Sequence, residues 1–255
     1  MITFVGLGLY DELDISLRGL EVVRNAELVF AEFYTSVLAG AKIAMLENLY
    51  GRKINLLKRE DIEQNFDNLL GLAKEKNVVL LCAGDSMTAT THSFLRVEAI
   101  KRGIKTQIIH GASIYTAAPA ILGLHIYKFG RCVSLPKPEK GFFPTSPYYS
   151  ILKNHENGLH TLILLDIKAE ENYLMSANEG IHILVELEER EKKGLFTAET
   201  KLCVVARAGS PDCIAAYGPI SEIERVDFGK PPHVLVLPGE LHFSEEESLK
   251  LIKVR

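Results

Sequence analysis

The chain has 255 residues, of which 47% are hydrophobic, and its formal net charge is −4 at pH 7. This length and apolar content suffice for one large domain or two of ordinary size, and we expect two. The acidic balance excludes a broadly basic surface, so no direct contact with nucleic acid is expected.

Short apolar runs alternate with helical periodicity in the first half, a pattern typical of parallel strands joined by crossover helices. The expected strands are residues 2–5, 28–30, 54–57, 78–82 and 106–109. Between the third and fourth strands, apolar residues at helical spacing predict one amphipathic helix. Its inner face carries Ile62, Phe66, Leu69, Leu70 and Ala73.

The second half changes character, and its expected strands are residues 131–135, 160–165, 201–205 and 233–237, with a weaker candidate at 218–223. Capping-box spacing from Ser176 to Glu179 predicts a helix that buries Ile181, Leu184 and Val185. Ser244 is expected to open a last helix in the same way.

These elements predict an α/β fold with two α/β domains and a ligand cleft between them. We place the boundary in the loop after the fifth strand. Residues 1–112 then form an N-terminal domain with a mostly parallel sheet, and residues 113–255 form a C-terminal domain with a mixed sheet. The chain opens directly on a strand, and it has no apolar run long enough for a signal or a span. We therefore expect a cytoplasmic protein without membrane attachment.

The four cysteines, Cys82, Cys132, Cys203 and Cys213, lack CxxC spacing and are predicted to be structural thiols. The eight histidines show no metal-ligand pairing with a nearby acid, so no metal is expected.

Gly84 and Asp85 directly follow the strand at 78–82, and a run of hydroxyls ending in His92 comes next. This places polar groups at the carboxyl edge of a sheet, where open α/β proteins bind ligands. Asp85 fits two interpretations, a hydrogen-bond acceptor for a ligand or a turn former. For His92 we favour a capping or packing role.

Gly6 and Gly8 follow the first strand in the manner of a dinucleotide fingerprint, with Glu32 where a ribose-binding acid would end the second strand. Asp11 replaces the third glycine, however, and a carboxylate there would oppose a phosphate. A different nucleoside-like ligand is therefore favoured, with a plain tight turn as the alternative.

Three aromatic residues, Phe33, Tyr34 and Tyr115, follow predicted strands, where a ring face could meet a cation, although ordinary packing is favoured. Small residues at 207–210 would let backbone approach a ligand, and a plain turn is the alternative. The residue pattern alone predicts a small polar ligand and assigns no catalytic group.

Several segments spread over nearly the whole chain carry a family resemblance, namely residues 4–11, 31–36, 84–85 with 89–92, 109–110 with 113–115, 123–130, 165–170, 206–210 and 231–233. In this order they resemble the archaeal diphthine synthases, a branch of the class III or tetrapyrrole methylase-like methyltransferases. The segments at 31–36 and 123–130 are particular to that branch. One departure is Ser86, which stands where the family usually has proline and bears on the rigidity of the turn.

The resemblance implies S-adenosyl-L-methionine bound folded in the cleft between the domains, S-adenosyl-L-homocysteine as the product, and a homodimer. The implied cofactor contacts are Leu9, Asp85, Thr88, Ser113, Ile114, Leu165, Ala208 and His233. The implied partner is translation elongation factor 2, whose 3-amino-3-carboxypropyl-histidine would be methylated three times on its amine to give diphthine. The alternatives are a precorrin-type tetrapyrrole C-methyltransferase and a non-catalytic nucleotide-responsive binding protein.

Overall fold

The computed structural model describes residues 1–34, 36–168 and 171–254, so Thr35, Ala169 and Glu170 of the resemblance segments lie outside the described residues. The chain divides into two compact units. Unit 1 holds Met1–Ile114 with Glu171, and unit 2 holds Tyr115–Lys168 with residues 172–254. Both are α/β, which confirms the predicted fold class. The domain limits 1–112 and 113–255 and the cleft between the domains stay predictions.

Unit 1 is built on a parallel five-stranded sheet in the order β3-β2-β4-β1-β5. The strands are β1 (Ile2–Gly6), β2 (Leu28–Glu32), β3 (Ile54–Leu57), β4 (Val78–Cys82) and β5 (Thr106–Ile109). All five predicted strands are present. The run in β4 is continuously apolar because helices cover both faces of this sheet, whereas the edge strands β3 and β5 include Asn55 and Gln107.

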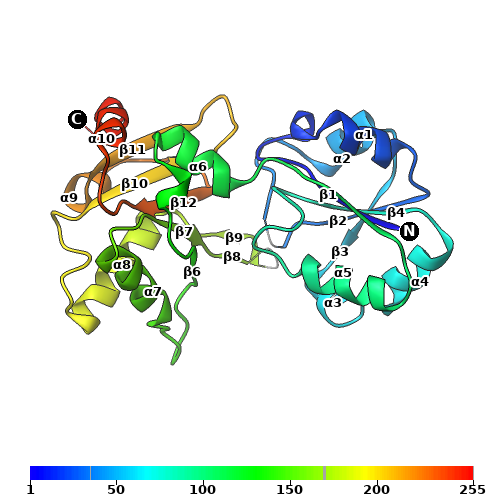
Figure 1. Ribbon diagram of the computed structural model, residues 1–255, viewed down its shortest axis with the longest axis horizontal. Helices are drawn as coiled ribbons and strands as arrows, with labels where there is room; N and C mark the ends of the chain where they lie inside the picture. Colours follow the sequence, from blue (N-terminus) through cyan, green and yellow to red (C-terminus); the bar gives the residue numbers. More distant parts are fainter. Residues whose placement is uncertain (35, 169–170, 255) are drawn as a thin grey trace. The chain divides into compact units, whose positions relative to one another are not determined.

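Helices α1 (Leu17–Arg24) and α2 (Ile43–Tyr50) cover one face, and α3 (Arg59–Glu63), α4 (Asp67–Glu75) and α5 (His92–Lys101) cover the other (Figure 1). The prediction of one helix between β3 and β4 is wrong, because α3 and α4 are separate. The amide of Asn65 bonds the carbonyl of Glu60 and closes α3. The buried residues Ile62 of α3 and Leu69 of α4 belong to the same core cluster. The apolar pattern therefore continues from one helix to the next and does not reveal the break between them.

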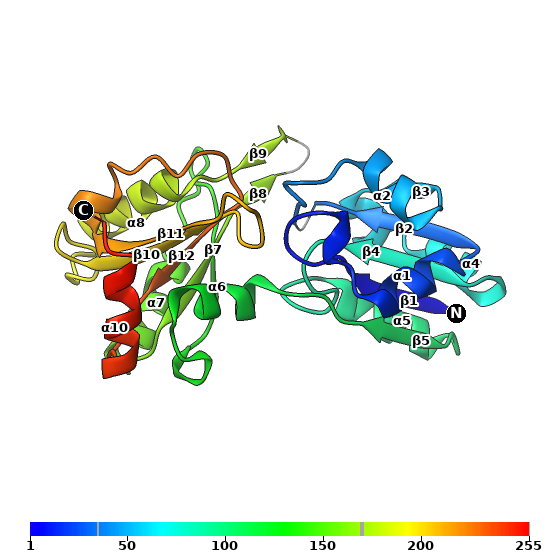
Figure 2. The same cartoon turned by 90° about the horizontal axis from the view of Figure 1, so that it is seen from above.

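Unit 2 contains a mixed sheet in the order β11-β10-β12-β7-β6, in which β6 and β7 are parallel and the other pairs antiparallel. Its strands are β6 (Val133–Leu135), β7 (Thr161–Leu165), β10 (Lys201–Ala206), β11 (Ile214–Pro219) and β12 (His233–Leu237). A separate ribbon of β8 (Ile167–Lys168) and β9 (Tyr173–Leu174) was not predicted (Figure 2). Two-residue strands are too short to show an apolar pattern.

The weaker strand candidate at 218–223 is wrong in its position. Strand β11 ends at Pro219, and helix α9 (Ile220–Ile223) follows at once. Proline has no N–H with which to continue the ladder, and its fixed φ suits a helix start. Ile220 and Ile223 are both buried at the i, i+3 spacing of a helix, but two apolar residues are too few to establish a helical period from the sequence.

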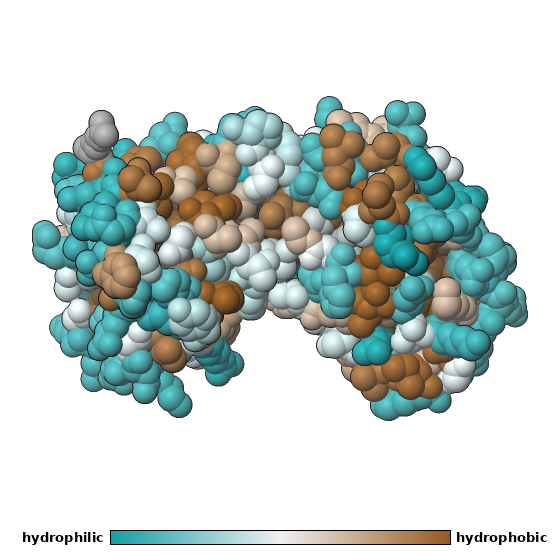
Figure 3. Space-filling model, turned by 45° about the horizontal axis from the view of Figure 1, so that its top comes forward, coloured by the Kyte–Doolittle hydropathy of each residue, from teal (hydrophilic) through white to brown (hydrophobic). Residues whose placement is uncertain are grey.

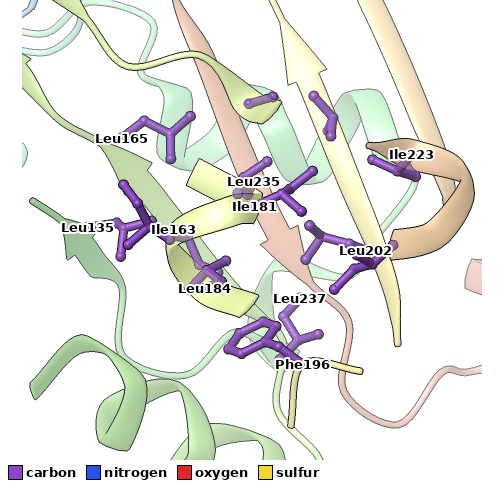
Figure 4. Close-up of a cluster of buried hydrophobic side chains, with 14 of the residues drawn as sticks. Leu135, Ile163, Leu165, Ile181, Leu184, Phe196, Leu202, Ile223, Leu235 and Leu237 are labelled. Atoms are coloured by element: carbon purple, nitrogen blue, oxygen red, sulfur yellow. The ribbon is translucent and has the colours of Figure 1, made fainter. Parts of the chain in front are cut away.

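Helices α7 (Ser146–Glu156) and α8 (Ala177–Glu191) lie on one face of this sheet, while α6 (Ile114–Leu122) and α10 (Phe243–Leu251) lie on the other (Figures 1 and 2). Ile181 and Leu184 of α8 pack against sheet residues that include Ile163 and Leu235 (Figure 4). Ser176 caps α8 as predicted, accepting the Glu179 amide at 3.2 Å, although Val185 is only half buried.

The last helix begins earlier than predicted, because His242 rather than Ser244 is its N-cap. The ring Nδ1 of His242 accepts the Ser244 amide at 3.4 Å, and Glu245 Oε2 accepts the His242 amide at 2.8 Å. These two bonds form a capping box with histidine in the place of the usual serine.

Hydrophilic residues interrupted by apolar groups cover the face seen in Figure 3. Within residues 1–34, 36–168 and 171–254, no helix combines the length and apolar character that a membrane crossing needs. All four cysteines are free of disulfides. Cys82 and Cys203 are buried in strands, whereas Cys132 lies just before β6 rather than inside the strand predicted at 131–135.

Candidate functional site

The crossover connections of unit 1 diverge between β4 and β1. The chain leaves β1 through α1 on one face of the sheet, and it leaves β4 through α5 on the other face (Figure 1). Ligands of open α/β sheets bind at such a point, outside the carboxyl ends of the strands. The loops after β1, β4 and β5 therefore form the candidate site of unit 1.

Glycine backbone holds these three loops in contact. The amide of Gly8 bonds the Gly84 carbonyl at 3.2 Å, and the Gly84 amide bonds the Gly8 carbonyl at 2.6 Å. A Cβ on Gly6 would lie 2.5 Å from the Gly84 oxygen and 2.7 Å from the Gly111 nitrogen. Glycine is thus needed at these positions for close backbone approach.

Carboxylate side chains accept hydrogen bonds from the backbone amides of the loop after β1. Asp14 Oδ2 accepts the amides of Leu9 at 3.0 Å and Tyr10 at 2.7 Å, and Asp11 caps the 3-10 turn η1 (Glu12–Asp14) by accepting the Leu13 amide at 2.9 Å. A dinucleotide pyrophosphate would need such amides for itself. This geometry agrees with the preference for a different ligand.

Asp85 lies at the centre of the loop contacts. Its Oδ1 accepts the Met87 amide at 2.9 Å and the Thr88 hydroxyl at 3.2 Å, and its Oδ2 accepts His110 Nδ1 at 2.8 Å and the Gly111 amide at 3.3 Å. Burial raises the pKa of Asp85, but the hydrogen bonds from Met87, His110 and Thr88 outweigh it and lower this pKa overall. The carboxylate is ionised and shapes the turn, as the structural interpretation of Asp85 requires.

His110 lies in one of the segments that carry the family resemblance, but the sequence analysis assigned it no role in the site. It follows β5 directly, as the Gly84–Asp85 turn follows β4, and its side chain is 73% exposed. The sequence feature that could have identified His110 as a site residue is its place at the carboxyl end of a predicted strand. Its contact with Asp85, 25 residues away along the chain, has no signature in the sequence.

The predicted contacts of unit 1 gather at this carboxyl edge. Thr88 touches Asp85, Leu9 lies in the loop after β1, and Ser113 and Ile114 follow the β5 loop at the start of α6. All five residues are half buried, and of the Asp85 side chain 8% is exposed, so a ligand can reach them. Their contact with a cofactor stays a prediction.

Glu32 and His92 lie beneath the Asp85 turn, and both side chains are 0% exposed. His92 Nδ1 lies 3.1 Å from the Ser86 carbonyl, and His92 Nε2 lies 3.4 Å from Glu32 Oε1. The packing role of His92 is confirmed, and Glu32 is too deeply buried to bind a ribose. The turn at Ser86 is thus anchored by a hydrogen bond to His92.

Cys82 approaches this pair, and the ligand atoms of Glu32, Cys82 and His92 all lie within 4.8 Å of one another. Burial, followed by the charges of Glu32 and Asp85, raises the pKa of the Cys82 thiol. The neutral thiol faces the Val5 carbonyl at 3.9 Å, whereas a metal ligand would be a thiolate. The three residues come from different elements, so sequence spacing could not show the cluster.

The predicted contacts of unit 2 also share one edge. Leu165 ends β7, His233 begins the antiparallel neighbour β12, and Ala208 follows β10, in which Ala206 pairs with His233. Ala208 and Leu165 are buried or nearly so. The register therefore brings these three positions together within unit 2.

The ring of His233 is fully engaged by its own chain. Nδ1 accepts the Ala177 amide at 3.0 Å, and Nε2 donates to the Lys230 carbonyl at 3.1 Å. Burial lowers the pKa of His233, with Arg207 acting in the same direction, so the ring is neutral near pH 7. A cofactor contact at His233 would be made by backbone.

Arg207 organises the turn that precedes Ala208. Its backbone has φ +51°, and its guanidinium bonds Asp212 Oδ2 at 2.6 Å and the Lys230 carbonyl at 2.9 Å. Its amide donates to the Pro232 carbonyl at 2.8 Å. The segment at 207–210 is therefore a turn tied to the strand that carries His233.

The predicted aromatic candidates differ in their surroundings. Tyr34 is buried, its ring lies 5.3 Å from the guanidinium of Arg59, and its hydroxyl meets Thr91 at 3.3 Å. Its ring thus already faces a cation. Phe33 packs against the core cluster of α1 and α2, and Tyr115 is half buried at the start of α6. A role in stabilising a bound cation stays a prediction for these two.

Comparison with known proteins gives matches over most of the chain. Residues 1–224 match the family described as tetrapyrrole (corrin/porphyrin) methylases. The diphthine synthase of Methanocaldococcus jannaschii is 48% identical over 254 residues, which cover 99% of this chain and 98% of that protein. The diphthine synthase of Methanocella arvoryzae is 49% identical over 252 residues, 98% of this chain and 97% of that protein. A crystal structure of a diphthine synthase superposes with a TM-score of 0.90 at 38% identity, covering 99% of this chain and 95% of that one.

Proposed function

Because this chain belongs to the tetrapyrrole methylase family, and within it to the diphthine synthases, we propose that it transfers methyl groups from S-adenosylmethionine to an amine. Family membership makes the chain a methyltransferase of diphthamide biosynthesis. The donor, the acceptor and the number of transfers are the proposal. The acceptor is the amine of the 3-amino-3-carboxypropyl-histidine of translation elongation factor 2, and three transfers give diphthine.

The charge at the carboxyl edge of unit 1 is the observation that carries the choice of donor. S-adenosylmethionine supplies a methyl group activated by a positively charged sulfur. The amides after β1 are taken by Asp14, and the Asp85 carboxylate is ionised at the end of β4. This edge presents carboxylates, so it suits a cationic donor better than a phosphate.

The edge of unit 2 suits the uncharged part of the donor. Leu165 and Ala208 offer apolar surface, and His233 offers backbone rather than a charged ring. An adenine ring is planar and apolar on its faces, and backbone groups can form hydrogen bonds with its polar edge. The proposed cofactor contacts are Leu9, Asp85, Thr88, Ser113, Ile114, Leu165, Ala208 and His233.

Methyl transfer to an amine is an in-line displacement. It depends on alignment and on exclusion of water, and the nucleophile must be a neutral amine. Two alternative functions are compared with this proposal, a precorrin methyltransferase and a binding protein without turnover. The full-length relatives are diphthine synthases, which favours the amine acceptor over a tetrapyrrole carbon. A homodimer and a cytoplasmic location are further parts of the proposal.

The test is incubation of the chain with methyl-labelled S-adenosylmethionine and either modified elongation factor 2 or a precorrin. We expect label in the elongation factor alone. S-adenosylhomocysteine at 100 times its Kd should also stabilise the fold by about 2.7 kcal/mol. Label in the precorrin alone would favour the first alternative, and ligand binding without any transfer would favour the second.

A further inference from the structure

Asp85 and His110 form a hydrogen-bonded pair whose outer end faces solvent. His110 Nδ1 lies 2.8 Å from Asp85 Oδ2, and the side chains of Asp85 and His110 are 8% and 73% exposed. An ionised carboxylate only accepts hydrogen bonds, so Nδ1 must carry the proton. In the neutral ring the basic lone pair is therefore on Nε2.

The carboxylate that orients this ring is itself fixed. Its other three hydrogen bonds come from the Met87 amide, the Thr88 hydroxyl and the Gly111 amide. The Gly111 amide belongs to the residue after His110, so backbone and ring of one loop are tied to the same carboxylate. A carboxylate in this position holds the tautomer of a histidine and stabilises its protonated form.

We propose that His110 Nε2 removes the proton from the acceptor amine before each methyl transfer. This inference rests on the proposed function and names a residue for its unassigned proton acceptor. The ammonium N–H bond breaks and an Nε2–H bond forms. The freed lone pair then bonds to the methyl carbon, the S–C bond breaks, and its electron pair stays on sulfur as a neutral thioether. The imidazolium returns its proton to water.

Five other ionisable groups at this edge are placed less well for this step. Glu32, Cys82 and His92 are buried beneath the turn. Asp85 already accepts four hydrogen bonds, and Asp14 accepts two loop amides. His110 presents a basic nitrogen to a ligand that approaches the carboxyl ends of β1, β4 and β5.

The test uses His110→Asn in the full chain. Asparagine can still donate to Asp85 from about the position of Nδ1, but it has no basic nitrogen. We expect the single-turnover rate of methyl transfer at pH 7 to fall by about 100-fold or more, the usual range for loss of a general base. Affinity for S-adenosylhomocysteine should not change. The exposed His155 on α7 supplies the matched control, and His155→Asn should keep the parental rate.

Two further readouts separate proton transfer from a structural role. The His110→Asn rate should depend more steeply on pH than the parental rate, because without the ring base only the amine's own loss of a proton supplies the nucleophile. Asp85 is the charged group in contact with His110, and Met87, Thr88 and Gly111 around it do not titrate. Free imidazole should restore activity to His110→Ala.

Parental rates and an unchanged pH profile in His110→Asn would overturn the inference while leaving the proposed function intact. Loss of rate in step with loss of S-adenosylhomocysteine affinity, without rescue by imidazole, would also overturn it, because the residue would then only shape the loop. If the parent protein itself transfers no methyl group to elongation factor 2, the proposed function fails and the inference falls with it.

Discussion

Glu32 and His92 fix the turn that carries Asp85. The Ser86 carbonyl can only accept, so His92 Nδ1 donates to it, and His92 Nε2 lies 3.4 Å from Glu32 Oε1. Both side chains are fully buried, where loss of a partner is costly.

Replacement of His92 by alanine should reduce the free energy of unfolding by about 3 to 5 kcal/mol, because it strips this partner from a buried carboxylate. Urea unfolding at pH 7 measures this change. The exposed His182 on α8 gives a control, and His182→Ala should stay within about 0.5 kcal/mol of the parent. In a double-mutant cycle, Glu32→Ala with His92→Ala should cost less than the two single changes added together. Strict additivity would contradict a direct interaction between these two side chains.

At the scale of the elements, backbone contacts set the distances between the loops that follow β1, β4 and β5. A Cβ on Gly111 would lie 2.5 Å from the Gly84 oxygen and 2.7 Å from the Gly6 carbonyl carbon. Backbone atoms cannot move aside as the end of a flexible side chain can. The loops must therefore separate if Gly111 gains a side chain.

Gly111→Ala should destabilise the fold by about 1 to 3 kcal/mol through this overlap, and it should weaken binding of S-adenosylhomocysteine. Calorimetric titration and thermal unfolding measure the two effects. Gly71 in α4 is the matched control, because a Cβ there meets nothing within 4 Å. Gly71→Ala should stabilise the fold by about 0.5 to 1 kcal/mol. Unchanged ligand affinity in Gly111→Ala would show that loop contact does not shape the site.

The start of α10 depends on a buried acid. Burial raises the pKa of Glu245, but hydrogen bonds from the His242 amide, Lys128, the His125 amide and His160 outweigh it and lower this pKa from 4.5 to about 2. A carboxyl with a depressed pKa stabilises the fold above its unfolded pKa, and this stability is lost as the pH falls toward the folded value.

The free energy of unfolding should therefore fall on acidification from about pH 6 to pH 2, with Glu245 contributing on the order of 3 kcal/mol. Glu245→Gln should be less stable than the parent at pH 6 and should lose less stability on acidification. The exposed Glu247 on the same helix pairs only with Lys250 at the surface in the described chain, so Glu247→Gln should follow the parental curve. Parallel curves for Glu245→Gln and the parent would contradict this account.

The sequence predicted the strands of unit 1 better than it predicted where some helices begin and end. The central strand β4 could be predicted because helices on both faces make its residues apolar without interruption, whereas the edge strands β3 and β5 carry Asn55 and Gln107 and were predicted from shorter apolar runs. The break between α3 and α4 could not be predicted, because an apolar face continues through it. The start of α9 could not be predicted either, because its two apolar residues, Ile220 and Ile223, are too few to establish a helical period. His242 escaped notice as a cap because its ring takes the place of a serine hydroxyl.

At the scale of the whole molecule, the residues of the candidate site were identified partly from the family resemblance and partly from the fold. The family resemblance supplied contact positions in both units, and the register of β10 and β12 brings Ala208 and His233 to one edge. Pairings such as Asp85 with His110 depend on strand order, which periodicity does not encode. The residue proposed as proton acceptor therefore emerged from the fold.

The central claim is repeated methyl transfer to one amine of elongation factor 2. The most direct measurement is mass spectrometry of the modified histidine after incubation with the parent chain and excess S-adenosylmethionine. We expect three added methyl groups on that one amine at completion. An unmodified histidine after prolonged incubation, in a protein that binds S-adenosylhomocysteine, would contradict the claim.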